Sequence, residues 1–461
     1  MIHTATNLWA SGEPGESSKL PLSALVGLGM MAVLPLLWVN LGRVLGLNLK
    51  LVHIGILVLT LLILIAPGYR RRIVDFTISS RLFVTAACCY LGLLVCSLGW
   101  SDAGSESFAQ LLKMSIYLYA FILLGGAFLG LRSSRAKAML FWGGAAAVAF
   151  FIGFASWTYS QFGRSLPNEF FDALLEGNIA KLQFGIYLDL FNYTSAGFSE
   201  RGSANWTGAS LRNTLIGGFV LAYISMQIGR VEAYRLSPAV ARLVFWGMSV
   251  VVILLIYGSL SRSNIVVFSI VLIVGHLPGM LHARLSMTRA VKFGGVLLLM
   301  SLGLLITSEI HIFGALAERL VAIGADPRLG MFDQAMTLIE SKWILGYGVG
   351  AVLPGVYENS VHNLFLAAWY QAGVIGMLVS VAFYGIVLSV WLRAMITLVV
   401  DHDQERREFP WICTLPILPL VRSLVSGDNG NFTLAEWSSL ALFYSMYLAY
   451  RNESRSALGT A

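Results

Sequence analysis

Long apolar stretches recur along the whole chain and are separated by mostly short polar segments. Each stretch approaches the roughly 20 residues that an α-helix needs to cross the hydrocarbon core of a bilayer. We therefore predict about twelve membrane-spanning helices. The spans are expected near residues 21–41, 51–67, 82–99, 111–130, 139–160, 207–228, 243–260, 264–281, 293–308, 363–391, 409–425 and 434–450. Kinks or broken turns are expected at Pro35, Pro278, Pro416 and Pro419.

The composition supports a membrane protein. Of the 461 residues, 57% are hydrophobic and 12% are charged, and the mean hydropathy is +0.75. Soluble domains carry about a quarter charged residues, so this chain is too apolar for a water-soluble core. We predict an all-α polytopic fold in which residues 1–461 form a single membrane domain. The polar residues 1–20 lack the pattern of a cleaved signal peptide, so the first helix is expected to be retained.

Basic residues occur in alternate short loops, and their distribution predicts the orientation of the chain. Because arginine and lysine are retained on the cytoplasmic side, these loops and both termini are expected to be cytoplasmic. The net charge of +7 is explained in this way without a nucleic-acid partner. Two long loops, 161–206 and 309–362, then face outward. The decisive basic residues are Arg70, Arg71, Arg72, Arg81, Arg132, Arg135, Lys137, Arg230, Arg235, Arg242, Arg284, Arg289, Lys292, Arg393, Arg406 and Arg407.

The second outer loop is expected to be largely helical. Asp326 followed by Pro327 is typical of a helix N-terminus, with proline at the first helical position. The spacing of the following apolar residues predicts one apolar helix face. That face consists of Leu329, Phe332, Ala335, Met336 and Ile339. We expect the helix to lie on the membrane or to cover a cavity.

Seven histidines occur, and the predicted topology places His362 at the outer start of a long apolar helix. A neutral imidazole there can accept a proton near pH 7, which makes His362 a candidate general base. The alternative is a helix-capping or interfacial histidine.

Arginines at the outer edge of the membrane are the second candidate group, because positive charge is disfavoured on this side. Arg201, Arg262 and Arg328 could together bind a phosphate or pyrophosphate through bidentate hydrogen bonds. The alternatives are an interfacial role for Arg262 and a surface helix charge for Arg328. Arg212 and Arg422, inside predicted helices, are either further ligands or members of buried structural pairs.

No metal or nucleotide site is expected. Asp401-His402-Asp403 resembles a cation-binding DxD motif, but it lies in a cytoplasmic loop away from the other candidates. Walker A, dinucleotide-binding, HExxH and nucleophile-elbow motifs are absent from the sequence. The cysteines are expected to pack inside helices without disulfides. They are Cys88, Cys89, Cys96 and Cys413. An outward site without nucleotide motifs favours a substrate that is already activated, such as a lipid-linked sugar pyrophosphate.

Four segments between residues 195 and 380 resemble, in order and spacing, the O-antigen ligase and polymerase-like proteins of bacterial envelopes. They are Arg201-Gly202-Ser203-Ala204-Asn205, Ser261-Arg262-Ser263, Asp326-Pro327-Arg328-Leu329 with the later Gly346-Tyr347-Gly348-Val349-Gly350, and His362-Asn363-Leu364-Phe365-Leu366. The earlier helices match only in hydropathy and number. The family tends to have Asn-Pro after the first arginine, whereas Trp206 follows Asn205 here, so no role is assigned to Asn205.

The resemblance implies a GT-C-like glycosyltransferase that transfers glycan from undecaprenyl pyrophosphate without metal or cofactor. For a ligase the acceptor is lipid A-core, at the periplasmic face of the bacterial inner membrane. In this interpretation Arg201, Arg262 and Arg328 bind the pyrophosphate, and His362 accepts the proton of the attacking hydroxyl. Asp428, in the last outer loop, would orient His362 or the acceptor.

Three other functions remain open from the sequence. An O-antigen polymerase would use a second lipid-linked repeat as acceptor, and a protein O-oligosaccharyltransferase would use an exported protein. The modest size of the outer loops favours the ligase. A transporter would be expected to show inverted repeats with paired broken helices near the midplane, and no such halves are evident.

Overall fold

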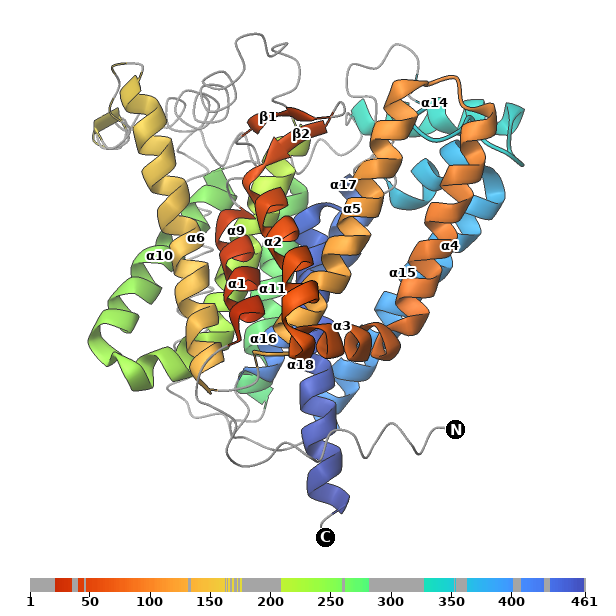
Figure 1. Ribbon diagram of the computed structural model, residues 1–461. Helices are drawn as coiled ribbons and strands as arrows, with labels where there is room; N and C mark the ends of the chain where they lie inside the picture. The colour runs from red at the N-terminus through yellow and green to blue at the C-terminus, as the bar shows by residue number, and fades with distance from the viewer. Residues whose placement is uncertain are drawn as a thin grey trace.

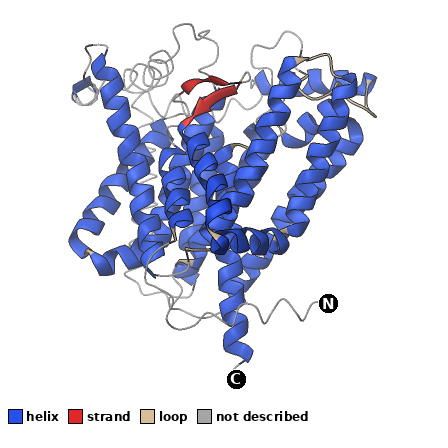
Figure 2. Cartoon of the chain, in the orientation of Figure 1, coloured by secondary structure: helices blue, strands red, loops and turns tan. Residues whose placement is uncertain are grey.

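The computed structural model describes residues 21–34, 40–44, 47–131, 134–161, 209–258, 262–281, 327–351, 363–400, 408–426 and 432–459, with isolated positions between 163 and 175 and at 353. Most of these residues are helical, and most of the helix axes are roughly aligned in one bundle (Figures 1 and 2). The elements, in chain order, are α1 (Leu22–Val33), β1 (Asn40–Val44), β2 (Leu47–Lys50), α2 (Leu51–Ile65), α3 (Pro67–Ser79), α4 (Arg81–Ser97), η2 (Leu98–Trp100), α5 (Ser105–Phe128), α6 (Ser134–Gln161), α9 (Ala209–Leu236), α10 (Pro238–Gly258), α11 (Arg262–Leu281), α14 (Pro327–Ser341), α15 (Leu364–Val400), α16 (Phe409–Thr414), α17 (Ile417–Ser426) and α18 (Leu434–Gly459).

The predicted spans coincide with helices over most of the described residues, but residues 40–41 of the first span belong to strand β1. The span expected at 293–308 lies outside the described residues. By length and composition, four of the described helices can cross a membrane, or five if the bent pair α2–α3 counts as one span. Four further apolar helices are shorter. The membrane character of the chain is therefore supported, whereas the number twelve stays a prediction.

Apolar side chains on the outside of the bundle agree with a lipid environment. Leu64 of α2 is 78% exposed, Leu243 of α10 is 76% exposed and Ile396 of α15 is 62% exposed. Soluble proteins rarely expose large contiguous apolar surfaces. A bilayer covers such helix faces without an unfavourable contact with water.

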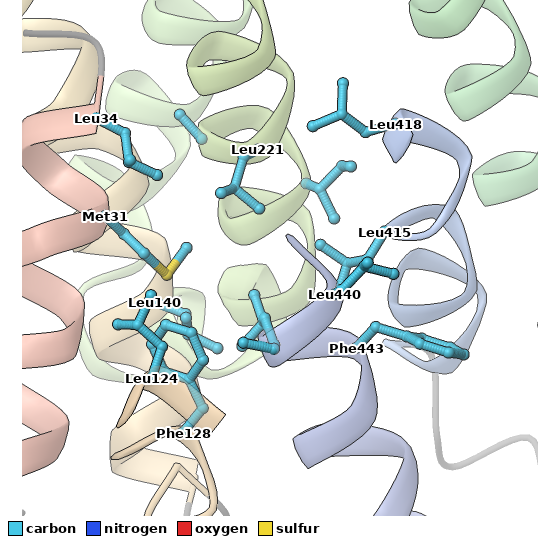
Figure 3. Close-up of a cluster of buried hydrophobic side chains, with 14 of the residues drawn as sticks. Met31, Leu34, Leu124, Phe128, Leu140, Leu221, Leu415, Leu418, Leu440 and Phe443 are labelled. Carbon is cyan, nitrogen blue, oxygen red and sulfur yellow. The ribbon is translucent and has the colours of Figure 1, made fainter. Parts of the chain in front are cut away.

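The interior of the bundle is closely packed. Figure 3 shows side chains from several helices meeting in one apolar cluster, among them Met31 of α1, Leu140 of α6 and Leu221 of α9. The backbones of α6 and α9 approach closely at Gly144 and Gly229, where an added Cβ would collide with the facing carbonyl groups. Small residues at such crossings are typical of helix packing in membranes, where dispersion contacts replace the hydrophobic effect.

Helix α3 lies across one end of the bundle (Figure 1). It is bent by 109° from α2, and the break falls at Ala66, which has a non-helical ψ of 88° before Pro67. A residue before proline disfavours the helical conformation, and proline is favoured at the first position of the next helix. The sequence predicts a loop at residues 70–72. This prediction is wrong, because these residues lie within α3.

Basic side chains of distant segments lie at one end of the bundle. The antiparallel hairpin β1–β2 and α14 lie at the end opposite α3 and the end of α18 (Figure 1). At the α3 end, Lys137 forms a 2.7 Å ion pair with Glu408, and Arg72 donates a 3.3 Å hydrogen bond to the Gly126 carbonyl. Basic residues that the sequence assigns to the cytoplasmic side thus gather at one end.

The described cysteines correct one sequence prediction. Cys413 is buried, as expected, but Cys88, Cys89 and Cys96 are exposed along α4. All four are free thiols. Periodicity alone cannot separate a lipid-facing cysteine from a packed one, because both faces of a membrane helix are apolar.

Helix α15 is sharply broken at Gly373, which has a φ of 68°. The rings of Phe365 and Tyr384, on either side of the break, lie 5.2 Å apart. At about 1.5 Å per residue, a straight helix would separate these residues by roughly 28 Å. The first part of α15 therefore turns back toward the second, which corrects the uninterrupted span predicted at 363–391.

The loop after α14 replaces hydrogen bonds that the broken helix loses. The Tyr347 amide donates to the Tyr370 carbonyl at 2.7 Å, and the Val374 amide donates to the Trp343 carbonyl at 2.9 Å. Irregular backbone at membrane depth is tolerated only where protein groups or water satisfy it. Left-handed φ angles, which favour glycine, allow tight turns in this glycine-rich stretch. They occur at Gly346, Gly348 and Gly350.

The break in α15 leads to a stability prediction. Gly373→Ala is expected to lower stability by more than about 2 kcal/mol, because a side chain is strained at this backbone conformation and its Cβ would collide with the Ile344 carbonyl. Gly385→Ala in the same helix is the matched control, since no atom lies within 4 Å of its added Cβ. Monodispersity after heating in detergent measures both variants. Equal heat resistance of the two would contradict the prediction.

Candidate functional site

The predicted site residues lie at or beyond the limits of the described residues. Arg201, His362 and Asp428 fall outside them. Arg262 is the first residue of α11 and Arg328 the second of α14, and only their backbones are described. The structure therefore defines the helices around the candidate site, and the roles of these five side chains stay predictions.

Asn363, the neighbour of His362, is fixed by hydrogen bonds on both sides. Its Oδ1 accepts from the amides of Phe365 and Leu366, each at 3.0 Å. Its Nδ2 donates to the Leu424 carbonyl of α17, also at 3.0 Å. Asn363 is thus the N-cap of α15, which takes the capping position that was one alternative for His362. The same bonds hold this point of the chain against α17.

Helix α11 brings the backbone of Arg262 to the same level. It packs against α16 and α17, with Gly275 facing the ring of Trp411. The two segments are antiparallel. The number of residues from Arg262 to Gly275 equals the number from Trp411 to Leu424. Because helices rise by equal steps per residue, Arg262 and Leu424 lie at about the same height. The start of α11 and Asn363 are therefore both near the end of α17.

Helix α14 covers the first part of α15. Ala335 and Ile339 are buried against Ala367 and Tyr370. The apolar face predicted for this helix is therefore confirmed at Ala335 and Ile339, whereas the side chain of Met336 is 39% exposed. The side chain of Leu329 is outside the described part of the chain.

A polar cluster anchors the glycine-rich loop on the other side. Ser107 donates a 2.6 Å hydrogen bond to the Val349 carbonyl, and the Val349 amide donates to Ser97 Oγ at 2.9 Å. Gln110 Nε2 donates to Gln371 Oε1 at 3.2 Å. These bonds tie the loop and the break in α15 to α4 and α5, so the segment leading toward His362 starts from a rigid base.

A buried ion pair stands between α17 and α18. Arg422 is 1% exposed, and its Nη1 lies 3.6 Å from Glu436 Oε1. The other oxygen of Glu436 accepts from the Thr433 amide at 2.5 Å, at the start of α18. Gly217 of α9 leaves room for the guanidinium, since an added Cβ would lie 2.8 Å from Nη1. Of the two sequence alternatives for Arg422, the structure supports the buried structural pair.

A small apolar pocket lies next to the start of α15. Its lining includes Leu364, Ser380 and Phe383 from both parts of that helix, together with Phe432 and Trp437 at the start of α18. Among the described residues that line the pocket, only Tyr90 carries an ionisable group. This lining can accommodate apolar groups.

Among the described residues, no group of three or more histidine, cysteine, aspartate or glutamate side chains is arranged to hold a metal ion. Asp401, His402 and Asp403 lie outside them. No protein-family model matches the chain, and no curated protein matches it either.

Two features of the helices around the candidate site were not predicted from the sequence. The turn of α15 has only a lone glycine as its signal, and glycine is also common in straight membrane helices. The second is the capping role of Asn363. The sequence does carry a signal for it, because asparagine before an apolar run is a strong N-cap signal.

Proposed function

We propose that this protein is a glycosyltransferase of the O-antigen ligase type, which transfers a glycan from undecaprenyl pyrophosphate to lipid A-core. The observation that carries the proposal is the convergence of two of the four family-like segments. The chain next to His362 is fixed to the carbonyl of Leu424, and α11, which begins at Arg262, runs beside the same helix. A base and a pyrophosphate ligand are needed together in such a reaction.

The proposed topology has about twelve spans in a GT-C-like arrangement. The end of the bundle with α14 faces the periplasm, and the basic end with α3 faces the cytoplasm of a bacterial cell. Residues 161–206 and 309–362 form the two outer loops. Lipid-linked donor and lipid A-core both reach this site from the outer leaflet of the inner membrane.

In the proposed mechanism, His362 accepts the proton of an acceptor sugar hydroxyl as its oxygen attacks the anomeric carbon. The bond from that carbon to the pyrophosphate oxygen breaks in the same displacement, with inversion. Arg201 and Arg262, together with Arg328, stabilise the negative charge that grows on the leaving pyrophosphate. Asp428 orients His362 or the acceptor. The resemblance implies no metal or cofactor.

Replacing Arg262 with lysine is expected to weaken donor binding about tenfold or more, because an ammonium cannot reproduce two parallel charge-assisted hydrogen bonds. Binding of lipid-linked glycan to the purified variant measures this effect. Arg235→Lys is the matched control, since Arg235 is 71% exposed and pairs with Glu232 at the opposite end. Near-normal donor binding by Arg262→Lys would assign Arg262 to the membrane interface instead.

Deletion of the protein tests the proposed function in cells. A ligase deletion leaves lipid A-core without glycan and accumulates full-length lipid-linked glycan. Loss of a polymerase would leave a single repeat on lipid A-core, and loss of a transporter would hold precursors on the cytoplasmic side. Either of the last two results would overturn the ligase proposal.

A further inference from the structure

Helix α3 has one face that is locked to the bundle. Tyr69 and Phe76 are buried, and the Tyr69 hydroxyl donates a 2.8 Å hydrogen bond to the Leu123 carbonyl of α5. Gly125 and Gly126 of α5 allow this approach, because side chains there would collide with Phe76 and with the backbone of α3. The helix is therefore held in a fixed position across the end of α5.

Arg72 strengthens this attachment. Its Nη2 donates a 2.9 Å hydrogen bond to Ser23 Oγ of α1, and its Nε donates a 3.3 Å hydrogen bond to the Gly126 carbonyl. This arginine thus belongs to the framework. Arg70 and Arg71, the two residues before it, are exposed.

The opposite face of α3 combines free positive charge with apolar side chains. Arg70 and Arg71 are exposed, and neither forms an ion pair or a side-chain hydrogen bond within the described residues. Val74 and Ile78 are 50% and 58% exposed. Because they follow Arg70 at steps of four residues, the three side chains form one line along the helix. Asp75, the acidic residue of α3, is half-buried.

The surroundings of this face are apolar. Ile65 at the end of α2 is 75% exposed and Leu82 at the start of α4 is 69% exposed. A soluble polyanion could pair with the arginines but would leave these side chains in water. A bilayer interface satisfies both, because guanidinium groups reach the phosphates while apolar side chains enter the acyl boundary.

We propose that the exposed face of α3 binds anionic phospholipid headgroups, with Arg70 and Arg71 on the phosphates and Val74 and Ile78 in the adjoining hydrocarbon. The helix lies in the plane of the interface at the basic end of the bundle. Negatively charged lipid is concentrated near such basic segments. The lipid would fix the depth of α3, and with it the ends of α2 and α4, in the membrane.

Retention of lipid by the full-length protein tests this proposal. The protein is equilibrated with equal amounts of phosphatidylglycerol and phosphatidylcholine in detergent, and bound lipid is counted by native mass spectrometry. Arg70→Gln/Arg71→Gln is expected to weaken phosphatidylglycerol binding by roughly thirty-fold, with phosphatidylcholine unchanged. In the wild type, 1 M salt is expected to have a similar effect, because exposed charges are screened.

Arg235→Gln/Arg393→Gln is the charge-matched control, since it removes two exposed arginines from the same end. It is expected to retain phosphatidylglycerol as the wild type does. Retention by the α3 variant, or an equal loss in the control, would overturn the proposal. Displacement of the bound lipid by millimolar inorganic phosphate would also overturn it, because the site would then accept any phosphate anion.

Discussion

Replacing His362 with alanine is expected to abolish glycan transfer while the protein stays folded and inserted. Without a base the attacking hydroxyl keeps its proton, and general-base catalysis contributes about 10²–10⁴-fold to such reactions. The start of α15 should be unchanged, because Asn363 caps this helix and bonds to α17. Transfer of glycan to lipid A-core by the purified variant is the measurement.

His53→Gln is the control for this experiment. His53 Nδ1 accepts a 3.0 Å hydrogen bond from the Lys50 amide at the start of α2, and glutamine at this third helical position can form the same bond. Transfer by His53→Gln is expected to match the wild type. Full transfer by His362→Ala would remove the general-base role and leave His362 as an interfacial residue.

The second large effect is expected from Arg422→Met. This change removes the guanidinium that lies 3.6 Å from the carboxylate of Glu436, in a part of the bundle where both side chains are buried. Removing one partner of a buried ion pair costs roughly 3–5 kcal/mol. We expect a marked loss of heat resistance in detergent, with transfer activity lost in proportion to folded protein.

The double variant Arg422→Met/Glu436→Gln separates charge from packing. Glutamine can still accept from the Thr433 amide but carries no charge, so most of the lost stability is expected to return. Arg235→Ala removes the exposed pair with Glu232 and is expected to change stability by less than about 1 kcal/mol. A double variant as unstable as Arg422→Met would show that arginine acts through its packing.

The sequence predicts most helix positions because the apolar stretches are long and their ends carry charge. It also predicts which loops share a side, and Arg72 and Lys137, which the sequence assigns to the cytoplasmic side, do lie at the same end of the bundle. It cannot predict the turn of α15. That turn depends on carbonyl and amide groups of residues 343–350, which belong to the loop after α14. Backbone partners of this kind leave no pattern in hydrophobicity.

The candidate site shows a similar division. Residue type and predicted topology identify His362 and the arginines as one group on the outer face. Which helices support them could not be predicted, since the bond from Asn363 to Leu424 joins distant segments. Arg422 was ambiguous for the same reason, because a buried arginine is explained only by its partner, here Glu436.

Reconstituted transfer tests the central claim most directly. Purified protein is mixed with undecaprenyl-pyrophosphate-linked glycan and lipid A-core in the presence of EDTA and without nucleotide, and the products are separated by size. The account predicts glycan-bearing lipid A-core from the wild type and none from His362→Ala. Longer lipid-linked chains with unmodified lipid A-core, or no covalent product at all, would contradict it.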